Sequence, residues 1–329
     1  MKKTRLIDIA KVAGVSEATV SLVLNNKPSR ISQNKKDEIR KIAEEMNYRP
    51  NHLARSLSTQ KSHTVGLIIP DIENPFFSTL SKQIEEIMRE KGYLVFIVNS
   101  DDSFHQDIEL IRELMDRQID GLLICPSTES YSNLDQVRSF YHQIEIPFVL
   151  VDRVFEGIDF NQVSFDHEYG GYIATQYLIE EGCKEIACFT GGLTTHSGNQ
   201  RYRGFEKAMN EANLKIDTNA IYDGDYRFET GYQFGKSVLE QNNIDGVFAF
   251  NDLMAYGLFK AMFETQTSSS KIKIVGYDNL KQSEMFGLPL TSVEQDINLL
   301  GNIACEQLLK QIDDENYKEN TVLKPKIAA

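Results

Sequence analysis

The 329-residue sequence lacks the features that would place a protein in or across a membrane. No apolar stretch approaches the roughly 18 residues that cross a bilayer. Near the N-terminus, Asp8 and Lys11 interrupt the apolar residues before a stretch of the length of a secretory signal develops. The sequence therefore predicts a protein that stays in the cytoplasm and has no membrane partner.

Cysteine is scarce as well. The four cysteines lie in apolar stretches, and no two of them have Cys-x-x-Cys spacing. In a reducing compartment such cysteines are typically small core residues rather than disulfide or zinc partners. We expect core positions for Cys125, Cys183, Cys188 and Cys305.

The common signatures of enzymes are missing. The sequence contains no GxxxxGK[ST] phosphate loop, no GxGxxG that opens a helix, no GxSxG nucleophile turn and no HExxH zinc motif. The six histidines are His52, His63, His105, His142, His167 and His196. They lack metal-ligand spacing, and we expect them to be solvated or to cap helices. The sequence thus favours a protein without catalytic activity, metal or cofactor.

Positive charge is sparse overall but concentrated at one end. The formal net charge is −13, yet residues 1–61 hold 13 basic and six acidic side chains, a local net charge of +7 that leaves −20 for the rest. A basic segment gains from neutralising phosphates, whereas an acidic segment is repelled by them. The length also exceeds that of one hydrophobic core, about 250–300 residues. Two or three domains are expected, one of which binds a polyanion.

Three short helical patterns occupy the first 48 residues. Gly14 ends the first pattern, Ser16 is placed to cap the second, and Ser32 is placed to cap the third. Three short helices with a tight glycine turn between the first two are typical of a helix-turn-helix. The residues expected to face inward are Ile9, Ala10, Val12, Ala13, Val20, Val23, Leu24, Ile39, Ile42, Ala43 and Met46.

A short helical pattern over residues 51–57 follows Pro50 and precedes a polar stretch. An isolated helix of this length is marginal in water, so it needs a partner or DNA to order it. We predict a DNA-binding domain over residues 1–48 and a hinge helix with its linker over residues 49–62.

From residue 64 onward, short apolar segments alternate with amphipathic ones. This alternation predicts an α/β core with parallel sheets that are covered by helices on both faces, and there are enough strands for two sheets. The expected strands are 65–69, 93–98, 121–125, 148–151, 185–189, 246–250 and 272–276. The expected helices are 75–91, 106–117, 132–143, 168–181, 200–212, 228–241, 252–264 and 296–312.

Polar and aromatic residues follow several of these strands. The segments are 71–77, Asp152-Arg153, Asn251-Asp252 and Asp278-Asn279. Ligands of open α/β sheets bind beyond the carboxyl ends of the strands. Carboxylate, amide and guanidinium groups can bond vicinal hydroxyls, and aromatic rings can cover the C–H faces of a sugar. Two interpretations remain open, a sugar-like site and polar residues that merely cap loops.

These features together resemble the LacI/GalR family of transcriptional regulators, and the resemblance covers essentially the whole chain. It is carried by residues 8–16, 18–21, 47–51, 54–57, 65–70, 120–121, 204–205 and 276–278. The resemblance implies a homodimer with a helix-turn-helix head, a hinge helix and a two-lobed core similar to periplasmic sugar-binding proteins. Its expected core subdomains are 63–162 with 293–323, and 163–292 with 324–329.

The resemblance also implies how double-stranded operator DNA is read. The recognition helix, residues 16–24, would enter the major groove, and Leu57 would intercalate in the minor groove. Many family members carry Arg where this chain has Leu22, so readout there is expected to be apolar. Glu17 could accept from a cytosine amino group or simply favour the helix N-terminus. The predicted DNA contacts are Thr4, Ser16, Glu17, Ala18, Thr19, Ser21, Leu22, Asn26, Tyr48, Asn51, Ala54, Arg55 and Leu57.

The core is similar to the ribose-binding type of periplasmic protein, with Tyr226 where that type has Phe. The ligand residues implied are Asn74, Phe76, Phe77, Asp152, Arg153, Arg201, Tyr226, Asn251, Asp278 and Gln295. Ribose or another pentose or furanose is the expected effector of a repressor of a sugar operon. The alternative is a catabolite-control regulator with a protein or phosphosugar co-repressor. The sequence leaves open whether the effector induces or co-represses.

Overall fold

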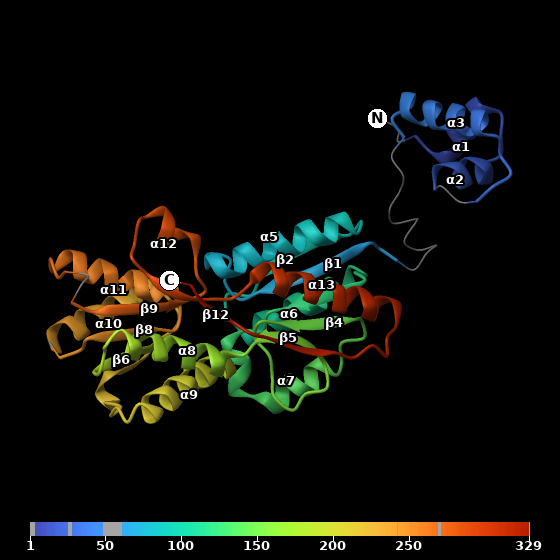
Figure 1. Ribbon diagram of the computed structural model, residues 1–329. Coiled ribbons are helices and arrows are strands. Elements are labelled where there is room, and N and C mark those ends of the chain that lie inside the picture. Colours follow the sequence, from blue (N-terminus) through green and yellow to red (C-terminus); the bar gives the residue numbers. More distant parts are fainter. Residues whose placement is uncertain (1–3, 26–27, 49–60, 242, 269–270, 329) are drawn as a thin grey trace. The chain divides into compact units, whose positions relative to one another are not determined.

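The computed structural model describes residues 4–25, 28–48, 61–241, 243–268 and 271–328. The chain divides into two compact units, Met1–Ser62 and His63–Ala329 (Figure 1). The predicted hinge helix, with Leu57, lies outside the described residues.

The first unit contains the three predicted helices, α1 (Leu6–Ala13), α2 (Glu17–Leu24) and α3 (Gln33–Glu45). Gly14 ends α1 in the left-handed conformation with φ 64°, a geometry that suits glycine. The side chain of Ser16 then begins α2 by accepting a hydrogen bond from the Thr19 amide at 3.1 Å. The buried core of this unit is Ile9, Ala10, Ala13, Val20, Val23, Ile39 and Ala43.

Two details of the predicted head were wrong. Val12 is 62% exposed, because the narrow face of α1 that packs on the other two helices is already filled by Ile9 and Ala13. Ser32 occupies the position before α3, but its side chain makes no capping hydrogen bond there.

The second unit contains two six-stranded sheets, as the alternating pattern predicts. In the first lobe, the order is β11-β5-β4-β3-β1-β2 and all neighbours are parallel. Its strands are β1 (Thr64–Ile69), β2 (Leu94–Asn99), β3 (Gly121–Ile124), β4 (Phe148–Val151), β5 (Asn161–Phe165) and β11 (Asn320–Leu323).

In the second lobe, the order is β12-β10-β9-β8-β6-β7, and only β12 is antiparallel to its neighbour. Its strands are β6 (Ile186–Thr190), β7 (Ile221–Asp223), β8 (Gly246–Ala249), β9 (Lys273–Tyr277), β10 (Thr291–Glu294) and β12 (Lys326–Ala328). Five short strands, β5, β7, β10, β11 and β12, were not predicted.

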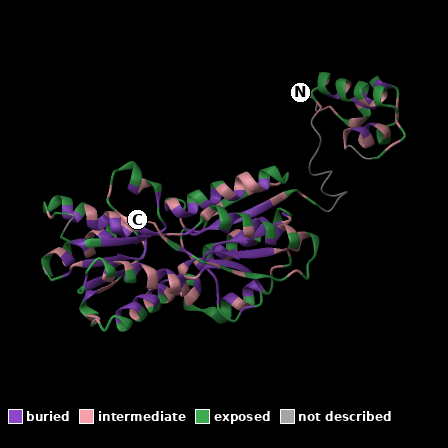
Figure 2. Cartoon of the chain, in the orientation of Figure 1, coloured by how far each residue is buried: buried purple, intermediate pink, exposed green. Residues whose placement is uncertain are grey.

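Helices cover these sheets, and buried residues are concentrated in the strands between them (Figure 2). The helices of the first lobe are α5 (Pro75–Glu90), α6 (Phe104–Asp116), α7 (Leu134–Tyr141) and α13 (Ile297–Asp313). Those of the second lobe are α8 (His167–Glu180), α9 (His196–Glu211), α10 (Phe228–Gln241), α11 (Asp252–Glu264) and the unpredicted α12 (Lys281–Met285). All four cysteines are buried in these cores, as expected.

The chain crosses between the lobes three times, after β5, after β10 and after β11. The predicted boundary between residues 162 and 163 falls inside β5, which pairs with β11 as far as Phe165. The predicted boundary between residues 292 and 293 falls inside β10, whose last residue, Glu294, pairs with Lys326. Both crossings therefore lie two to three residues later than expected, because each strand stays paired in its sheet up to Phe165 and Glu294, respectively.

Helices α8 and α9 pack closely because glycines line their contact. A Cβ atom on Gly171 would lie 2.1 Å from the Arg201 carbonyl oxygen, and one on Gly204 would lie 2.0 Å from the Glu168 carbonyl oxygen. Backbone atoms of a neighbouring helix cannot yield as a flexible side chain can. This contact sets the position of Arg201 on α9.

We expect Gly204→Ala to lower the free energy of unfolding by about 1–3 kcal/mol, because the added methyl group forces the two helices apart. Urea denaturation measures this change. Gly301→Ala in α13 is the matched control, because its closest neighbour is the flexible Gln83 side chain. An unfolding midpoint for Gly204→Ala equal to that of the unaltered protein would contradict the packing argument.

Candidate functional site

All ten side chains predicted to bind a ligand line one cavity between the two lobes. Nine of them come from the ends of strands or the starts of helices, and Arg201 lies in the second turn of α9. Ser197 also lines the cavity. The cavity has a volume of about 30 Å³.

Two asparagines of the set also serve as helix caps. Asn74 Oδ1 accepts from the Phe76 amide at 3.0 Å, which starts α5 and leaves the amide N–H₂ as the group Asn74 can offer to a ligand. Asn251 Oδ1 accepts from the Met254 amide at 3.0 Å, and its Nδ2 donates to the Tyr226 carbonyl at 2.7 Å. Asn74 and Asn251 therefore both cap helices and line the cavity. Asn251 additionally positions the Tyr226 loop.

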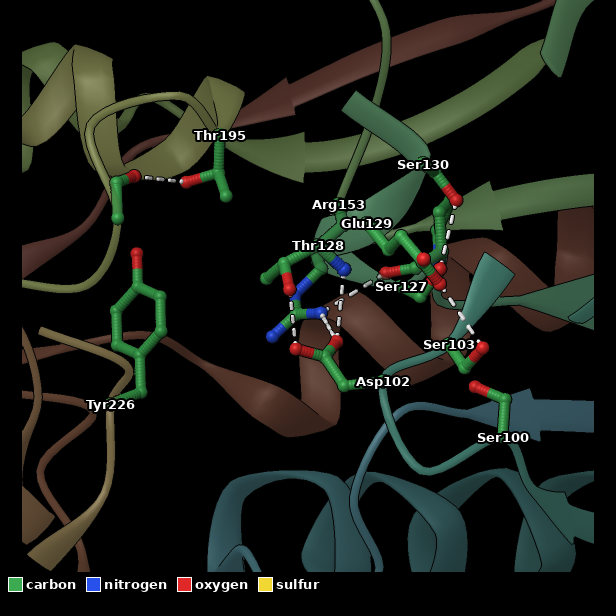
Figure 3. A network of polar contacts seen from close by, with 12 residues as sticks. Ser100, Asp102, Ser103, Ser127, Thr128, Glu129, Ser130, Arg153, Thr195 and Tyr226 are labelled. Carbon is green, nitrogen blue, oxygen red and sulfur yellow. Dashed lines mark hydrogen bonds and ion pairs between the residues drawn. The ribbon is translucent and has the colours of Figure 1, made fainter. Parts of the chain in front are cut away.

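In the first lobe, Arg153 is held by a network around Asp102 (Figure 3). Its Nη1 donates to Asp102 Oδ1 at 2.6 Å and to the Pro126 carbonyl at 3.1 Å. Asp102 also accepts from the Thr128 amide and hydroxyl. The guanidinium lies 5.3 Å from the centroid of the Phe77 ring. Burial opposes the charge, but Asp102 outweighs it and raises the pKa of Arg153, so this residue stays cationic.

Sequence reasoning missed Asp102, although a signal was present. Asp101 and Asp102 lie two and three residues beyond the end of β2, and polar residues at the carboxyl ends of strands indicate ligand sites in such sheets. Because β2 is the edge strand of its sheet, the sequence alone does not show that Asp102 lies close to the cavity.

In the second lobe, Arg201 on α9 is 5% exposed and is held on several sides. Its Nη1 donates to the Phe250 carbonyl, and its Nη2 donates to Gln295 Oε1 at 3.2 Å. The guanidinium carbon lies 3.6 Å from the centroid of the Tyr277 ring. Burial disfavours the charge, but nearby Tyr277, Tyr226 and the acidic side chains raise the pKa of Arg201.

His167 was expected to be solvated or to cap a helix, and this expectation was wrong. It is the first residue of α8, is only 2% exposed, and lies against Arg201. Burial is the main cause that lowers its pKa well below the usual histidine range, so the imidazole is neutral. The close packing of α8 on α9 buries it, which periodicity alone does not reveal.

Three cavity residues have a backbone conformation that favours glycine. The φ angles are 66° for Asp152, 65° for Tyr226 and 100° for Asp278. Such conformations cost on the order of 1–3 kcal/mol each and are concentrated at functional sites.

Burial raises the pKa of the carboxyl groups of Asp152 and Asp278, and Arg201 is the main charge that opposes this rise. A side-chain hydrogen bond from Gln295 also lowers the pKa of Asp152.

Tyr226 closes the cavity from the second lobe. Its ring packs directly on Gly191, where a Cβ atom would lie 2.0 Å from the ring. Its hydroxyl is 3.5 Å from Ser197 Oγ. Ser197 was not predicted, although it stands four residues before Arg201 on α9 and therefore on the same helix face.

The mouth of the cavity is strongly acidic. A wider hollow of about 470 Å³ adjoins it and shares Asn74, Phe77, Arg153 and Tyr226 with it. The acidic residues that line this hollow are Asp71, Glu73, Asp101, Asp102, Asp225 and Glu229, whereas its basic residues are Arg153 and Arg227.

Among the described residues of the chain, no group of three or more His, Cys, Asp or Glu side chains is placed to hold a metal ion.

The predicted DNA contacts that the structure describes lie in the first unit. Glu17 and Ala18 are exposed at the start of α2, and Leu22 is half-buried one turn later. Ser16 and Thr19 share a hydrogen bond between their hydroxyls at 2.9 Å. The further described contacts are Thr4, Ser21 and Tyr48.

Thr4 and Tyr48 brace the helices of this unit. The Thr4 hydroxyl donates to the Met46 carbonyl at 2.9 Å, beyond the end of α3. Burial and then the charge of Glu17, the first residue of α2, raise the pKa of Tyr48. The remaining predicted contacts, Asn26, Asn51, Ala54, Arg55 and Leu57, lie outside the described residues.

Models of known families match both units of the chain. The model described as bacterial regulatory proteins, lacI family, matches residues 5–51, and the one described as periplasmic binding proteins and sugar binding domain of LacI family matches residues 62–327. This chain belongs to the LacI family. It is a DNA-binding transcriptional repressor with a ligand-binding core, and no helix within its described ranges is both long and apolar enough to cross a bilayer.

Relatives of this LacI-family repressor are similar over nearly their whole length. The transcriptional repressor PurR of Histophilus somni strain 2336 is 34% identical over 96% of this chain and 94% of its own length. PurR of Vibrio atlanticus is 32% identical over 95% of this chain and 93% of its own length. The described relatives are repressors rather than enzymes.

Solved structures of the family share the fold. A regulator from Enterococcus faecium with bound ribose is 28% identical with a TM-score of 0.72, and covers 81% of this chain and 97% of its own. A regulator from Alkaliphilus metalliredigens with D-xylulofuranose is 27% identical with a TM-score of 0.71 and the same coverage. The operator-bound Lac repressor dimer has a TM-score of 0.89 at 24% identity over 100% of this chain and 98% of its own.

Proposed function

We propose that this repressor controls a sugar operon and responds to a small neutral sugar, a pentose or another furanose, bound between its lobes. The observation that carries the proposal is the lining of the cavity, where the carboxyl group of Asp152 and the amide of Gln295 lie buried beside two guanidinium groups and several aromatic rings. A sugar hydroxyl can donate to the carboxylate while another accepts from the amide, and the rings can cover the C–H faces.

The charges favour an uncharged ligand over a phosphosugar. The cavity itself holds two carboxyl groups, Asp152 and Asp278, and two guanidinium groups, Arg153 and Arg201. Each guanidinium is already held by protein acceptors, and the mouth carries an excess of carboxylates. A phosphate group would have to pass this mouth against repulsion. The sugars bound in the two solved relatives support the same class of ligand.

Repression requires contact with DNA and a response to the ligand. We infer a homodimer that acts in the cytoplasm at the nucleoid, whose recognition helices enter successive major grooves and whose Leu57 side chains enter the minor groove between them. Closure of the lobes on a sugar would rotate the first lobes and release the DNA. The two binding events would then share one coupling free energy, typically about 1–3 kcal/mol.

A thermal-shift panel tests the ligand class. It contains ribose, fructose and other pentoses, their phosphorylated counterparts, and purine bases, which are planar and could also stack on the cavity's aromatic rings. A neutral sugar at 100 times its Kd is expected to stabilise the protein by about 2.7 kcal/mol. The response should disappear in Asp278→Asn and persist in Asp116→Asn, an exposed position on α6. A response to purines or phosphosugars, with none to neutral sugars, would refute the proposal.

A further inference from the structure

His167 lies where the chain first crosses between the lobes. It follows β5 by two residues and is the first residue of α8. The preceding Asp166 accepts from the Tyr169 amide at 2.9 Å to start this helix, and its own amide donates at 2.8 Å to the carbonyl of Leu323, at the third crossing. The position of His167 is therefore tied to two of the three connections between the lobes.

The same side chain contacts the buried Arg201. His167 Nδ1 is 3.4 Å from both Arg201 Nε and Arg201 Nη2, and 3.2 Å from the Tyr277 hydroxyl. Guanidinium nitrogens only donate, so Nδ1 must be the acceptor and the imidazole proton must reside on Nε2. The neutral state of His167 fits this assignment, because an imidazolium could not accept and would add a second cation beside Arg201.

The second crossing holds the same guanidinium from another side. Gln295 directly follows β10, and its Oε1 accepts from Arg201 Nη2 at 3.2 Å. Two connections between the lobes thus supply acceptors for one guanidinium, which also lines the ligand cavity. Any ligand that moves Arg201 must move these acceptors or break their hydrogen bonds.

We propose that His167 is a positioning residue, whose neutral Nδ1 orients Arg201 for the sugar and links that arginine to the first crossing between the lobes. The sugar part of this inference rests on the proposed function. The effect of His167 on the position of Arg201 does not depend on which ligand binds and can be tested without one. A purely structural role would require only that the volume of the imidazole be filled, so an apolar side chain of similar size would serve equally well.

Two variants separate these roles. His167→Asn keeps an acceptor close to the position of Nδ1, whereas His167→Leu fills the space without one. In protein labelled with ¹⁵N-arginine, the Nε–H resonance of Arg201, assigned with Arg201→Met, is expected to be protected from exchange in the unaltered protein and in His167→Asn. It should exchange rapidly or shift in His167→Leu. This measurement requires no ligand.

Calorimetric titration of the full chain with ribose and fructose supplies the second readout. We expect sugar affinity to fall about 10-fold to 100-fold in His167→Leu, the effect of losing a hydrogen bond to a charged group. In His167→Asn it should stay within about threefold of the unaltered protein, because one acceptor–donor bond is retained. Thermal melts establish that the variants fold, and His167→Met replaces the leucine variant if that one does not.

Three results would overturn the inference: an unchanged Arg201 resonance in His167→Leu, an unchanged sugar affinity in that variant, or an equal loss in His167→Asn. If the unaltered protein binds no sugar, the proposed function fails. The arginine resonance then still decides whether His167 positions Arg201.

Discussion

Replacing Arg201 with methionine is expected to abolish detectable sugar binding, with a loss of affinity of more than about 100-fold. The substitution removes hydrogen-bond donors from the cavity and leaves Asp152 and Asp278 buried without their principal opposing charge. Both carboxyl groups would then be protonated at higher pH than before, and a protonated carboxyl group is a poorer acceptor for sugar hydroxyls. Calorimetric titration with the sugar identified in the panel measures the loss.

Arg203→Met provides the matched control for this change. Arg203 stands two residues further along α9, with a mostly exposed side chain that lies 3.5 Å from Glu168. An exposed ion pair of this kind contributes little, so sugar binding should be retained. In a mobility-shift assay, the Arg201→Met protein should bind operator DNA but not be released by sugar. Sugar binding by Arg201→Met at the unaltered affinity would remove Arg201 from the site.

Operator affinity is expected to fall about 10³-fold to 10⁵-fold between 50 and 200 mM salt if the repressor neutralises 6–10 phosphates. The net charge of +7 on residues 1–61 of each chain is the basis of this expectation, because bound phosphates release condensed counterions. The acidic remainder, with −20, should stay away from the duplex. Fluorescence anisotropy with labelled operator DNA over a salt series measures the slope.

Sugar binding is the internal control for the salt series. A neutral ligand releases no counterions, so its affinity should change little over the same range. An operator affinity that is independent of salt would contradict the assignment of the basic segment to phosphate contact. Lys41→Gln, at an exposed position on α3, tests whether single charges of the head contribute to the slope.

The pattern of apolar residues predicted most of the fold, because buried parallel strands and amphipathic helices leave strong periodic signals. The strand 148–151 and the helices 228–241 and 252–264 have the predicted limits. The missed strands gave weaker signals. In β5, the polar side chains Asn161, Gln162 and Ser164 are buried, and Asn161 and Gln162 bond loop backbone groups that only the folded chain brings near.

The sequence by itself determined the two charge regimes, the helix-turn-helix and the paired α/β lobes, and its resemblance to the LacI/GalR family supplied the ten residues that line the cavity. Polar residues such as Asp152, Asn251 and Asp278 follow strands, and the carboxyl ends of parallel strands lie at one edge of the sheet. Only the tertiary structure showed that Asn251 holds the Tyr226 loop, that Asp102 holds Arg153, and that His167 is buried against Arg201. Such contacts join residues dozens of positions apart, and they depend on backbone packing, such as that of Gly171 and Gly204, which periodicity does not encode.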